Sequence, residues 1–516
     1  MSDVVGRHRH AARLTRRPRR RALAAVAGAV GLLVVVNSVV REPSVQAAGG
    51  QFVGAPALPV VQMNRASAWR CPGPLPVGAG KESSRISIVN SGSSAVAIMM
   101  IVSRTGLPKG GTSSGASVSR ARFAVDGHSQ AVLALSRRGR AGFAAVSVET
   151  DGGGVGVGES IVGGSSLGGP AYLSSPCSLA AGPRGFVPTG STYGGSDVRV
   201  SLFDPNATPA VVDVGISTGV TLTSPPAFQG LVVPPTGVVV LDLRRWVLQQ
   251  SSLAVTATAV SGDIVVGALE VTSETVTLAS RSKTNHAVAH VSVTGSSLLV
   301  GPDRGLSRWT FVSRQSRKGV ASMFAVYNPG ARSVSVSVSP PGRAGIAEAL
   351  TEEVPAAGTI DFATPVTTGG GIGFGSVVIS AQGSPVVVAR RTTRYRTRSL
   401  EELDSTPGTA GPHDQWLIPG ASSTSQTDDV VALVDPGPLG AKVTLSELTH
   451  SSAAPVRFKI VEVGPGSEMA LDLNKILKKD PAFAVEVSAT VPILVEQQLT
   501  ALHGLTTACG AIPVLH

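Results

Sequence analysis

The heptapeptide FAVYNPG, residues 324–330, decides the fold, because its pattern occurs four times along the chain. A run of alternating apolar residues ends in Asn or Asp, and turn-forming residues follow. The other copies are ISIVNSG (86–92), VSLFDPN (200–206) and VALVDPG (431–437), and the Asn or Asp positions lie 114, 124 and 107 residues apart. Equal spacing of one pattern indicates tandem repeats of about 100 residues.

Each copy of the turn has the same neighbours in the sequence. A large aromatic residue precedes the turn by 18 to 21 residues. A second alternating run, a Pro/Gly turn with a short strand, and a closing hairpin follow. The hairpin ends in a polar residue, namely Glu159, Glu270, Arg390 or Glu496. Four landmarks in the same order, four times, predict a fourfold tandem duplication.

The repeats predict an all-β fold. Each contains roughly seven short runs of period two, separated by Gly, Pro, Asn and Asp. This pattern is typical of an antiparallel sandwich of the immunoglobulin or fibronectin-III type, with one face of each sheet buried. Propeller blades are the competing interpretation, but blades are usually shorter. The predicted sandwiches are residues 66–170, 171–285, 286–400 and 401–516, and their predicted core aromatics are Trp69, Phe186, Trp309 and Trp416.

The amino terminus carries most of the net charge. Residues 1–21 contain eight Arg and one Asp, which is +7 of the total +11, so the other 495 residues carry only +4. The uncharged residues 22–40 follow, and a basic segment before such an apolar stretch predicts a single transmembrane helix or uncleaved signal with the body outside the cytoplasm. Small residues around Ala47 leave cleavage after that residue, and secretion, as the alternative. Residues 41–65 are expected to be a linker.

The three cysteines, Cys71, Cys177 and Cys509, form no CxxC pair, so the sequence predicts neither a zinc site nor a redox dithiol. An oxidising compartment permits one disulfide. Three pairings are open from the residues alone, and we favour Cys71–Cys177, because each of these cysteines lies beside a proline in a segment that precedes a repeat core.

Several segments resemble a family of uncharacterised actinobacterial envelope proteins, a domain of unknown function behind an N-terminal membrane segment. They are Trp69 with CPGPLPVG, Pro176-Cys177 before FVPTGSTYGG, NATPAVVDV and LVVPPTGVVVLDL. The resemblance extends over about residues 20–516. It implies pairing of Cys71 with Cys177 and a cell-envelope setting, often beside genes for envelope glycosyltransferases. It implies no activity.

The sequence predicts no catalytic, cofactor-binding or metal site. Two G-x-S-x-G matches lie in Gly/Ser-rich loops, where no nucleophile elbow is expected. One basic cluster is notable, and it is a candidate anion-binding patch for envelope polymers or an acidic partner. The alternative is a charged edge strand that protects against aggregation. The cluster consists of Arg390, Arg391, Arg394, Arg396 and Arg398.

These features predict a non-enzymatic cell-envelope scaffold or interaction protein, a tethered extracellular rod of four sandwiches. One alternative is an accessory subunit or enzyme of cell-wall polysaccharide metabolism. Another is an adhesin or extracellular ligand sensor. We expect no cofactor and no nucleic-acid partner, because the net charge is concentrated in the first 21 residues. The expected contacts are the membrane, through residues 22–40, and envelope proteins or anionic polymers.

Overall fold

The structure is a computed structural model, and its described residues all belong to one of two units, Ala55–His516. The other unit is Met1–Gly54. No helix in the described part of the chain is long and apolar enough to cross a membrane. The predicted span 22–40 lies outside that part. The described residues are 58–78, 82–113, 115–135, 140–163, 171–279, 288–312, 320–341, 350–363, 376–396, 399–425, 427–449, 454–477, 480–501 and 506–515.

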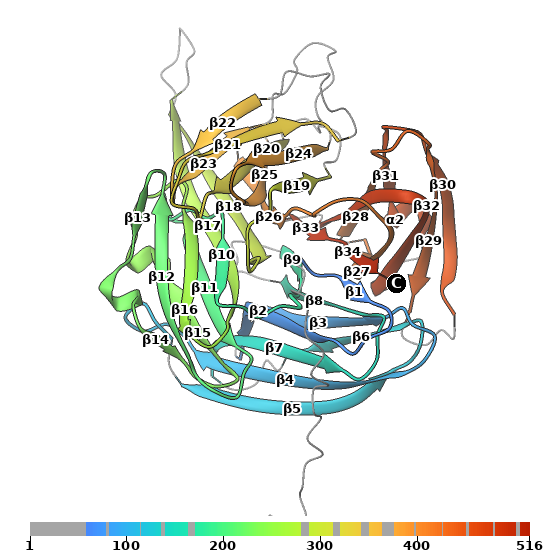
Figure 1. Ribbon diagram of the computed structural model, residues 1–516, viewed down its shortest axis with the longest axis horizontal. Coiled ribbons are helices and arrows are strands. Elements are labelled where there is room, and N and C mark those ends of the chain that lie inside the picture. Colours follow the sequence, from blue (N-terminus) through green and yellow to red (C-terminus); the bar gives the residue numbers. More distant parts are fainter. Residues whose placement is uncertain are drawn as a thin grey trace, which may run out of the picture. The chain divides into compact units, whose positions relative to one another are not determined.

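The unit consists of four antiparallel sandwiches with one topology (Figure 1). In each, the first, sixth, third and fourth strands pair in that order to form one sheet, called here the A sheet. The fifth, second, seventh and eighth strands form the B sheet. The strands of the first sandwich, in chain order, are β2 (Ala68–Val77), β3 (Ser83–Asn90), β4 (Val96–Gly106), β5 (Ala116–Val125), β6 (Ser129–Ala134), β7 (Gly142–Thr150), β8 (Val155–Gly163) and β9 (Ala171–Pro176).

The second and third sandwiches repeat this strand order. In the second, the fourth position is shared by two short strands. The second sandwich contains β10 (Arg184–Val187), β11 (Asp197–Asp204), β12 (Ala210–Thr218), β13 (Thr221–Thr223), β14 (Leu231–Val233), β15 (Gly237–Asp242), β16 (Ala254–Ser261), β17 (Val265–Ala279) and β18 (Val288–Val300). The third contains β19 (Arg308–Phe311), β20 (Val320–Tyr327), β21 (Val334–Ser339), β22 (Leu350–Val354), β23 (Thr359–Ala363), β24 (Val377–Gln382), β25 (Val387–Arg396) and β26 (Ser399–Pro407).

In the fourth sandwich a single strand, β32 (Asp480–Ala501), serves as both sixth and seventh strand. Two further strands, β1 (Val61–Gln62) and β34 (Ile512–Leu515), extend its A sheet. Short helical turns also occur between strands. The turn η2 (Pro226–Phe228) lies between β13 and β14, whereas η3 (Leu243–Arg245) and α2 (Leu473–Ile476) follow the fifth strands of the second and fourth sandwiches. The remaining strands are β27 (His413–Ser423), β28 (Thr427–Val434), β29 (Ala441–Leu448), β30 (Val456–Val463), β31 (Glu468–Asp472) and β33 (Thr506–Gly510).

The nearly all-β structure with several separate sheets agrees with the predicted sandwich class. The predicted core aromatics Trp69, Trp309 and Trp416 are fully buried in their sandwiches. Phe186 is 2% exposed, but it packs in the cluster of the third sandwich and not in the core of its own, because its side chain lies on the outer face of the sheet. The indole nitrogens of Trp309 and Trp416 donate to equivalent carbonyls, those of Val386 and Ile493, at 2.8 and 3.0 Å. The sequence suggested seven strands. The eighth strands β9 and β18 lie beyond the predicted boundaries at 170 and 285, and β26 straddles residue 400.

The sandwiches pack against one another through the outer faces of their sheets. Between the first and second, Phe143 of β7 joins one apolar cluster with Phe203 and Val265 of the next B sheet. Between the second and third, Phe186 of β10 lies 6.1 Å, centroid to centroid, from Tyr327 of β20. In both junctions an A sheet therefore packs on the following B sheet.

The same contact occurs between the third and fourth sandwiches and, most importantly, between the fourth and first. Val312, just after β19, packs with Val434 and Leu494 of the fourth B sheet. Leu417 of the fourth A sheet joins the core of the first sandwich. The eighth strands also meet, β9 with β18, β18 with β26, β26 with β33 and β33 with β9. The series therefore closes, and the predicted linear rod is wrong.

The closing contact relies on a glycine in β8. A Cβ at Gly156 would lie 2.7 Å from Leu417 Cδ2, so any larger residue would force this leucine to shift. Leu417 and Gly156 are separated by more than two whole sandwiches in sequence, and their contact exists only because the first and fourth sandwiches touch.

We predict that Gly156→Val lowers the free energy of unfolding by about 1–3 kcal/mol, as overpacking does. Urea denaturation measures the effect. Gly411→Val is the matched control, because nothing lies within 4 Å of a Cβ there. Adding Leu417→Ala to Gly156→Val should recover part of the loss. Equal stability of Gly156→Val and Gly411→Val would argue against the closed series.

Candidate functional site

A polar side chain occupies the same face of the seventh strand in every sandwich. In β8, Val157 and Ile161 belong to the sandwich core, and Glu159 lies between them on that face. Glu270 follows Val266 and Ala268 in β17, and Arg390 follows Val388 in β25. These residues share a face because strand side chains alternate. With their fourth counterpart they are almost completely buried, Glu159 and Gln497 at 0% exposure, Arg390 at 1% and Glu270 at 3%.

Each of these side chains binds the segment at or after the first strand of its sandwich. Glu159 Oε2 accepts the Gly73 N–H at 3.1 Å. Burial raises the pKa of Glu270, and the Ser191 backbone is among the groups that oppose this rise. Arg390 Nη1 donates to the Val312 carbonyl. A recurring bond of this kind serves the fold, because it satisfies backbone groups where the first strand becomes irregular.

In the fourth sandwich, Gln497 contacts the first strand indirectly, through the side chain of Asp429. Gln497 Nε2 donates to both carboxyl oxygens of Asp429, at 3.0 and 2.8 Å, and Asp429 accepts the Ser422 N–H at 2.9 Å. Burial raises the pKa of Asp429 to about 7. The sequence pattern predicted Glu496, and not Gln497, as the fourth counterpart of Glu159, Glu270 and Arg390. A shift of one residue moves a side chain to the opposite face of a strand, so Glu496 points out of its sandwich.

Two buried ion pairs join neighbouring sandwiches at the seventh strands. Arg391 Nη2 lies 2.6 Å from Glu270 Oε1, and Arg390 Nη2 bonds Glu496 Oε1. Burial raises the pKa of both glutamates, and their arginine partners oppose that rise. The third sandwich thus pairs with the second through Arg391 and with the fourth through Arg390.

These pairs change the interpretation of the arginine cluster. Arg390 is buried, and the Arg391 side chain is only 16% exposed, so neither belongs to an exposed anion-binding platform. The reason is that β25 lies between neighbouring sandwiches and not at an outer edge. Arg394 and Arg396 are part of β25, but their side chains lie outside the described residues, as does all of Arg398.

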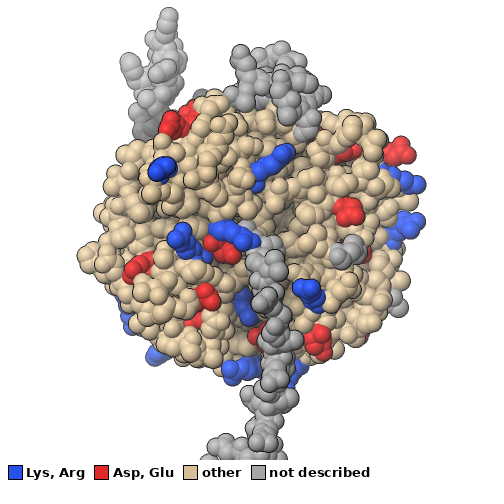
Figure 2. Space-filling view, in the orientation of Figure 1, with Lys and Arg blue, Asp and Glu red and all other residues tan. Residues whose placement is uncertain are grey.

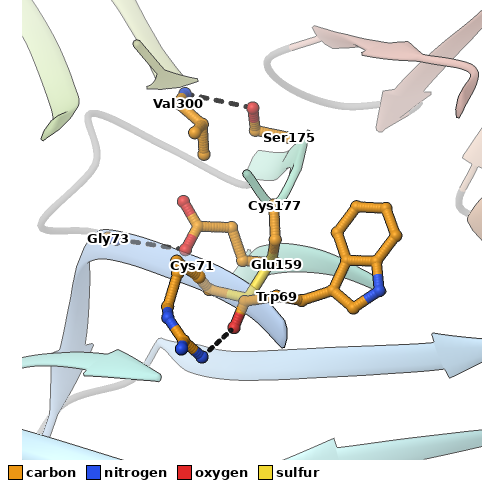
Figure 3. Close-up of a disulfide and its surroundings, with 8 residues drawn as sticks. Trp69, Cys71, Gly73, Glu159, Ser175, Cys177 and Val300 are labelled. Atoms are coloured by element: carbon orange, nitrogen blue, oxygen red, sulfur yellow. Dashed lines mark hydrogen bonds between the residues drawn. A yellow bond between two sulfur atoms is a disulfide. The ribbon is translucent and has the colours of Figure 1, made fainter. Parts of the chain in front are cut away.

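The disulfide Cys71–Cys177 is present, as predicted, with a Cα–Cα distance of 4.6 Å. Both cysteines are fully buried, and Figure 3 shows Glu159 directly beside them. A carboxylate oxygen and the two Sγ atoms lie within 4.8 Å of one another. A disulfide sulfur is not a thiolate, so in this form the three residues do not make a set of zinc ligands. The side chain of Cys509 lies outside the described residues.

Glu159 is held in an apolar environment. Its Oε1 has no hydrogen-bond partner, and burial raises the pKa of this carboxyl to about 8, although the Gly73 N–H opposes the rise. Glu159 is therefore mostly protonated at neutral pH. The carboxyl proton of Glu159 is buried inside the first sandwich, whereas a general acid has to come within hydrogen-bond reach of its substrate.

The surface differs from this charged interior. On the face drawn in Figure 2, acidic and basic side chains are scattered among uncharged ones, and several lie next to a side chain of opposite charge. More than half of the exposed large hydrophobic side chains of the described residues lie in the second sandwich. They are Tyr193, Val220, Leu222, Val232, Trp246, Leu248 and Val260.

Comparison with known proteins gives no family. No family model matches the chain, and no curated protein matches it. A crystal structure titled Thermotoga maritima 1070 is 17% identical, with 20% of this chain and 97% of that chain covered and a TM-score of 0.19. A tetra-tandem repeat from the extending region of a large adhesion protein is 15% identical, with 82% and 92% covered and a TM-score of 0.10. These scores are too low to support an argument about fold or function.

We predict that Arg390→Met costs about 3–5 kcal/mol of unfolding free energy, because it leaves Glu496 buried without its partner. The double variant Arg390→Met with Glu496→Met should recover most of this loss, since both charges are then removed. Chemical denaturation of the two single variants and the double variant gives the coupling energy. Strictly additive losses would contradict a direct pair.

We predict that Glu159→Gln stabilises the protein at alkaline pH. The folded pKa of about 8 lies above the ordinary value of 4.5, so the wild-type stability from the protonated group is complete below pH 4.5 and is lost as pH rises toward 8. Glutamine stays neutral throughout. Denaturation midpoints at pH 5 and 8.5 should therefore diverge less in the variant than in the wild type.

The matched control is Glu149→Gln, whose side chain is 47% exposed. It should leave the pH profile unchanged. A variant Glu159→Gln with the wild-type pH profile would show that Glu159 is ionised in the folded protein.

Proposed function

We propose that this protein is a non-enzymatic scaffold or interaction protein of the cell envelope. Residues 22–40 tether it to the membrane, and the closed set of four sandwiches stands outside the cytoplasm. Cleavage after Ala47 would release the same body as a secreted protein. The eight arginines of residues 1–21 support this orientation, because basic segments stay on the cytoplasmic side.

One surface feature carries the proposal. On the A sheet of the second sandwich, Val211 pairs with Val232 of β14 on one side and with Ser261 of β16 on the other, beside a bulge that contains Val260. Val232 is 60% exposed and Val260 is 68% exposed. We call Val211, Val232 and Val260 the valine patch. Val232 and Val260 are exposed, and Val211 is half-buried beside them. Exposed apolar side chains that gather on one sheet face mark interaction sites.

The occupant that fits the valine patch is an apolar β-sheet face of a partner protein. The patch continues a face that already makes such a contact, because Phe186 and Ala254 of the same A sheet pack in one cluster with Tyr327 and Val387 of the third sandwich. A partner sheet would extend that packing over the uncovered valines. Association would depend mainly on apolar burial.

Site-specific photocrosslinking in the native cells tests this function. With a photoreactive residue at position 232, we predict one discrete crosslinked product, and Val260→Glu should abolish it. Glutamate at this exposed position should change stability by less than about 0.5 kcal/mol. The matched control places the photoreactive residue at Val456, which is 51% exposed in the fourth sandwich.

Equal crosslinking from positions 232 and 456, or a product unaffected by Val260→Glu, would overturn the valine patch as the docking site. Identification of the product by mass spectrometry then distinguishes the partner classes. A polysaccharide-processing enzyme would make the protein an accessory subunit, whereas a host or neighbouring-cell protein would make it an adhesin.

A further inference from the structure

The turn that follows each second strand is the same in all four sandwiches. The Asn or Asp side chain accepts the N–H two residues later, in Gly92, Asn206, Gly330 and Gly437, at 2.7–2.9 Å. The carbonyl of that later residue in turn accepts an N–H from the hairpin before the fifth strand. The donors are His128, Thr236, Ala357 and Gly466, at 2.7–3.1 Å, and all four have positive φ.

In two copies the side chain is Asn, and its amide nitrogen serves three carbonyls. Asn328 Nδ2 donates to the carbonyls of Arg332, Val354 and Pro355 at 2.7, 3.2 and 3.0 Å. Asn90 Nδ2 donates in the same way to three carbonyls at 2.8–3.1 Å, those of Ser94, Val125 and Asp126. Both asparagines are fully buried.

In the other two copies the side chain is Asp, which has no such donor. Asp204 and Asp435 are also fully buried, and their Oδ1 atoms make the same turn bonds. Their Oδ2 atoms take the place of the amide nitrogen and have no hydrogen-bond partner. A carboxylate oxygen therefore replaces a donor at a point toward which the backbone directs carbonyl oxygens.

A positive charge at this point would remove the conflict. A buried carboxylate without a partner is costly, and adding carbonyl dipoles with the same sign increases the cost. One proton on Oδ2 could serve a single carbonyl. A cation bound by oxygen ligands can be shared by all of them, and carboxylate and carbonyl oxygens are ligands that hard cations prefer.

We propose that Asp204 and Asp435 each bind a monovalent alkali cation, Na⁺, between Oδ2 and the carbonyls equivalent to those bound by the asparagines. The charge decides between ions, because Na⁺ with one carboxylate is neutral, whereas a divalent ion would leave a buried net charge. The equivalent carbonyls belong to Thr208, Val233 and Pro234 in the second sandwich and to Leu439, Val463 and Gly464 in the fourth.

The Asp435 site is the simpler of the two. In the second sandwich, burial raises the pKa of Asp204 and the nearby Asp263 adds to the rise, whereas hydrogen bonds from the Asn206 and Ala210 groups oppose it. Asp263 adds a second negative charge near the first site, which strengthens its attraction for a cation. The two sites are therefore tested separately as well as together.

The test measures thermal midpoints in NaCl and in N-methyl-D-glucamine chloride at equal ionic strength. We expect the wild type to melt about 2 °C higher in Na⁺, because an ion that binds only the folded state stabilises it. The double variant Asp204→Asn with Asp435→Asn should show no difference between the salts, since it restores the amide of the other two copies. The single variants should each retain part of the difference.

Asn328→Asp is the reciprocal variant, and it should increase the Na⁺ dependence. Thallium(I), a heavy substitute for alkali ions, should give anomalous scattering peaks beside Asp204 and Asp435 in soaked crystals. Three results would overturn the proposal: equal wild-type midpoints in the two salts, a Na⁺ effect that survives in the double variant, or a midpoint that responds to pH or Ca²⁺ but not to Na⁺.

Discussion

The packing of each A sheet on the B sheet of the next sandwich is the contact on which the structure depends. It buries the second and seventh strands on both faces, as in β8, where seven consecutive residues are buried. Such a head-to-tail contact forms a closed set only when its rotation returns to the start, and here the fourth A sheet reaches the first B sheet. Closure covers the B sheet of every sandwich, so none is left open at an end of the series. It also buries the four seventh strands, so their charged side chains need partners inside the protein.

Much of the fold could be predicted because period two and the Asn/Asp turns are local signals. The four copies and the sandwich class follow from them. The disulfide pairing was favoured on other grounds, namely the prolines beside Cys71 and Cys177 and the family resemblance. The closure could not be predicted, because an outward apolar residue such as Phe203 or Tyr327 has the same pattern whether it meets solvent or another sandwich. The eighth strand was missed for a related reason. β9 and β18 lie after long connections, so their residues read as the beginning of the next repeat.

The arginine cluster shows where sequence reasoning about a site fails. Five arginines within nine residues resemble a solvated basic surface, and on most proteins that interpretation holds. The decisive information lies elsewhere in the chain, in Glu270 and Glu496, which are 121 and 106 residues from their arginine partners. The one available signal was the polar residue that ends each closing hairpin, because it recurs at a position that the topology buries. Its recurrence pointed to the fold and not to a ligand.

Equivalent positions in the four sandwiches have diverged in charge, and this divergence makes the copies distinct. The inward position of the seventh strand is Glu, Glu, Arg or Gln, and the turn position is Asn or Asp. Among the seventh strands only β25 of the third sandwich has adjacent arginines, and each neighbouring sandwich supplies one glutamate. Exchanging the third and fourth sandwiches would bring Glu270 and Glu496 to one buried junction without an arginine between them, which is costly. The apolar contacts thus allow closure, while the buried charges fix the order of the sandwiches within it.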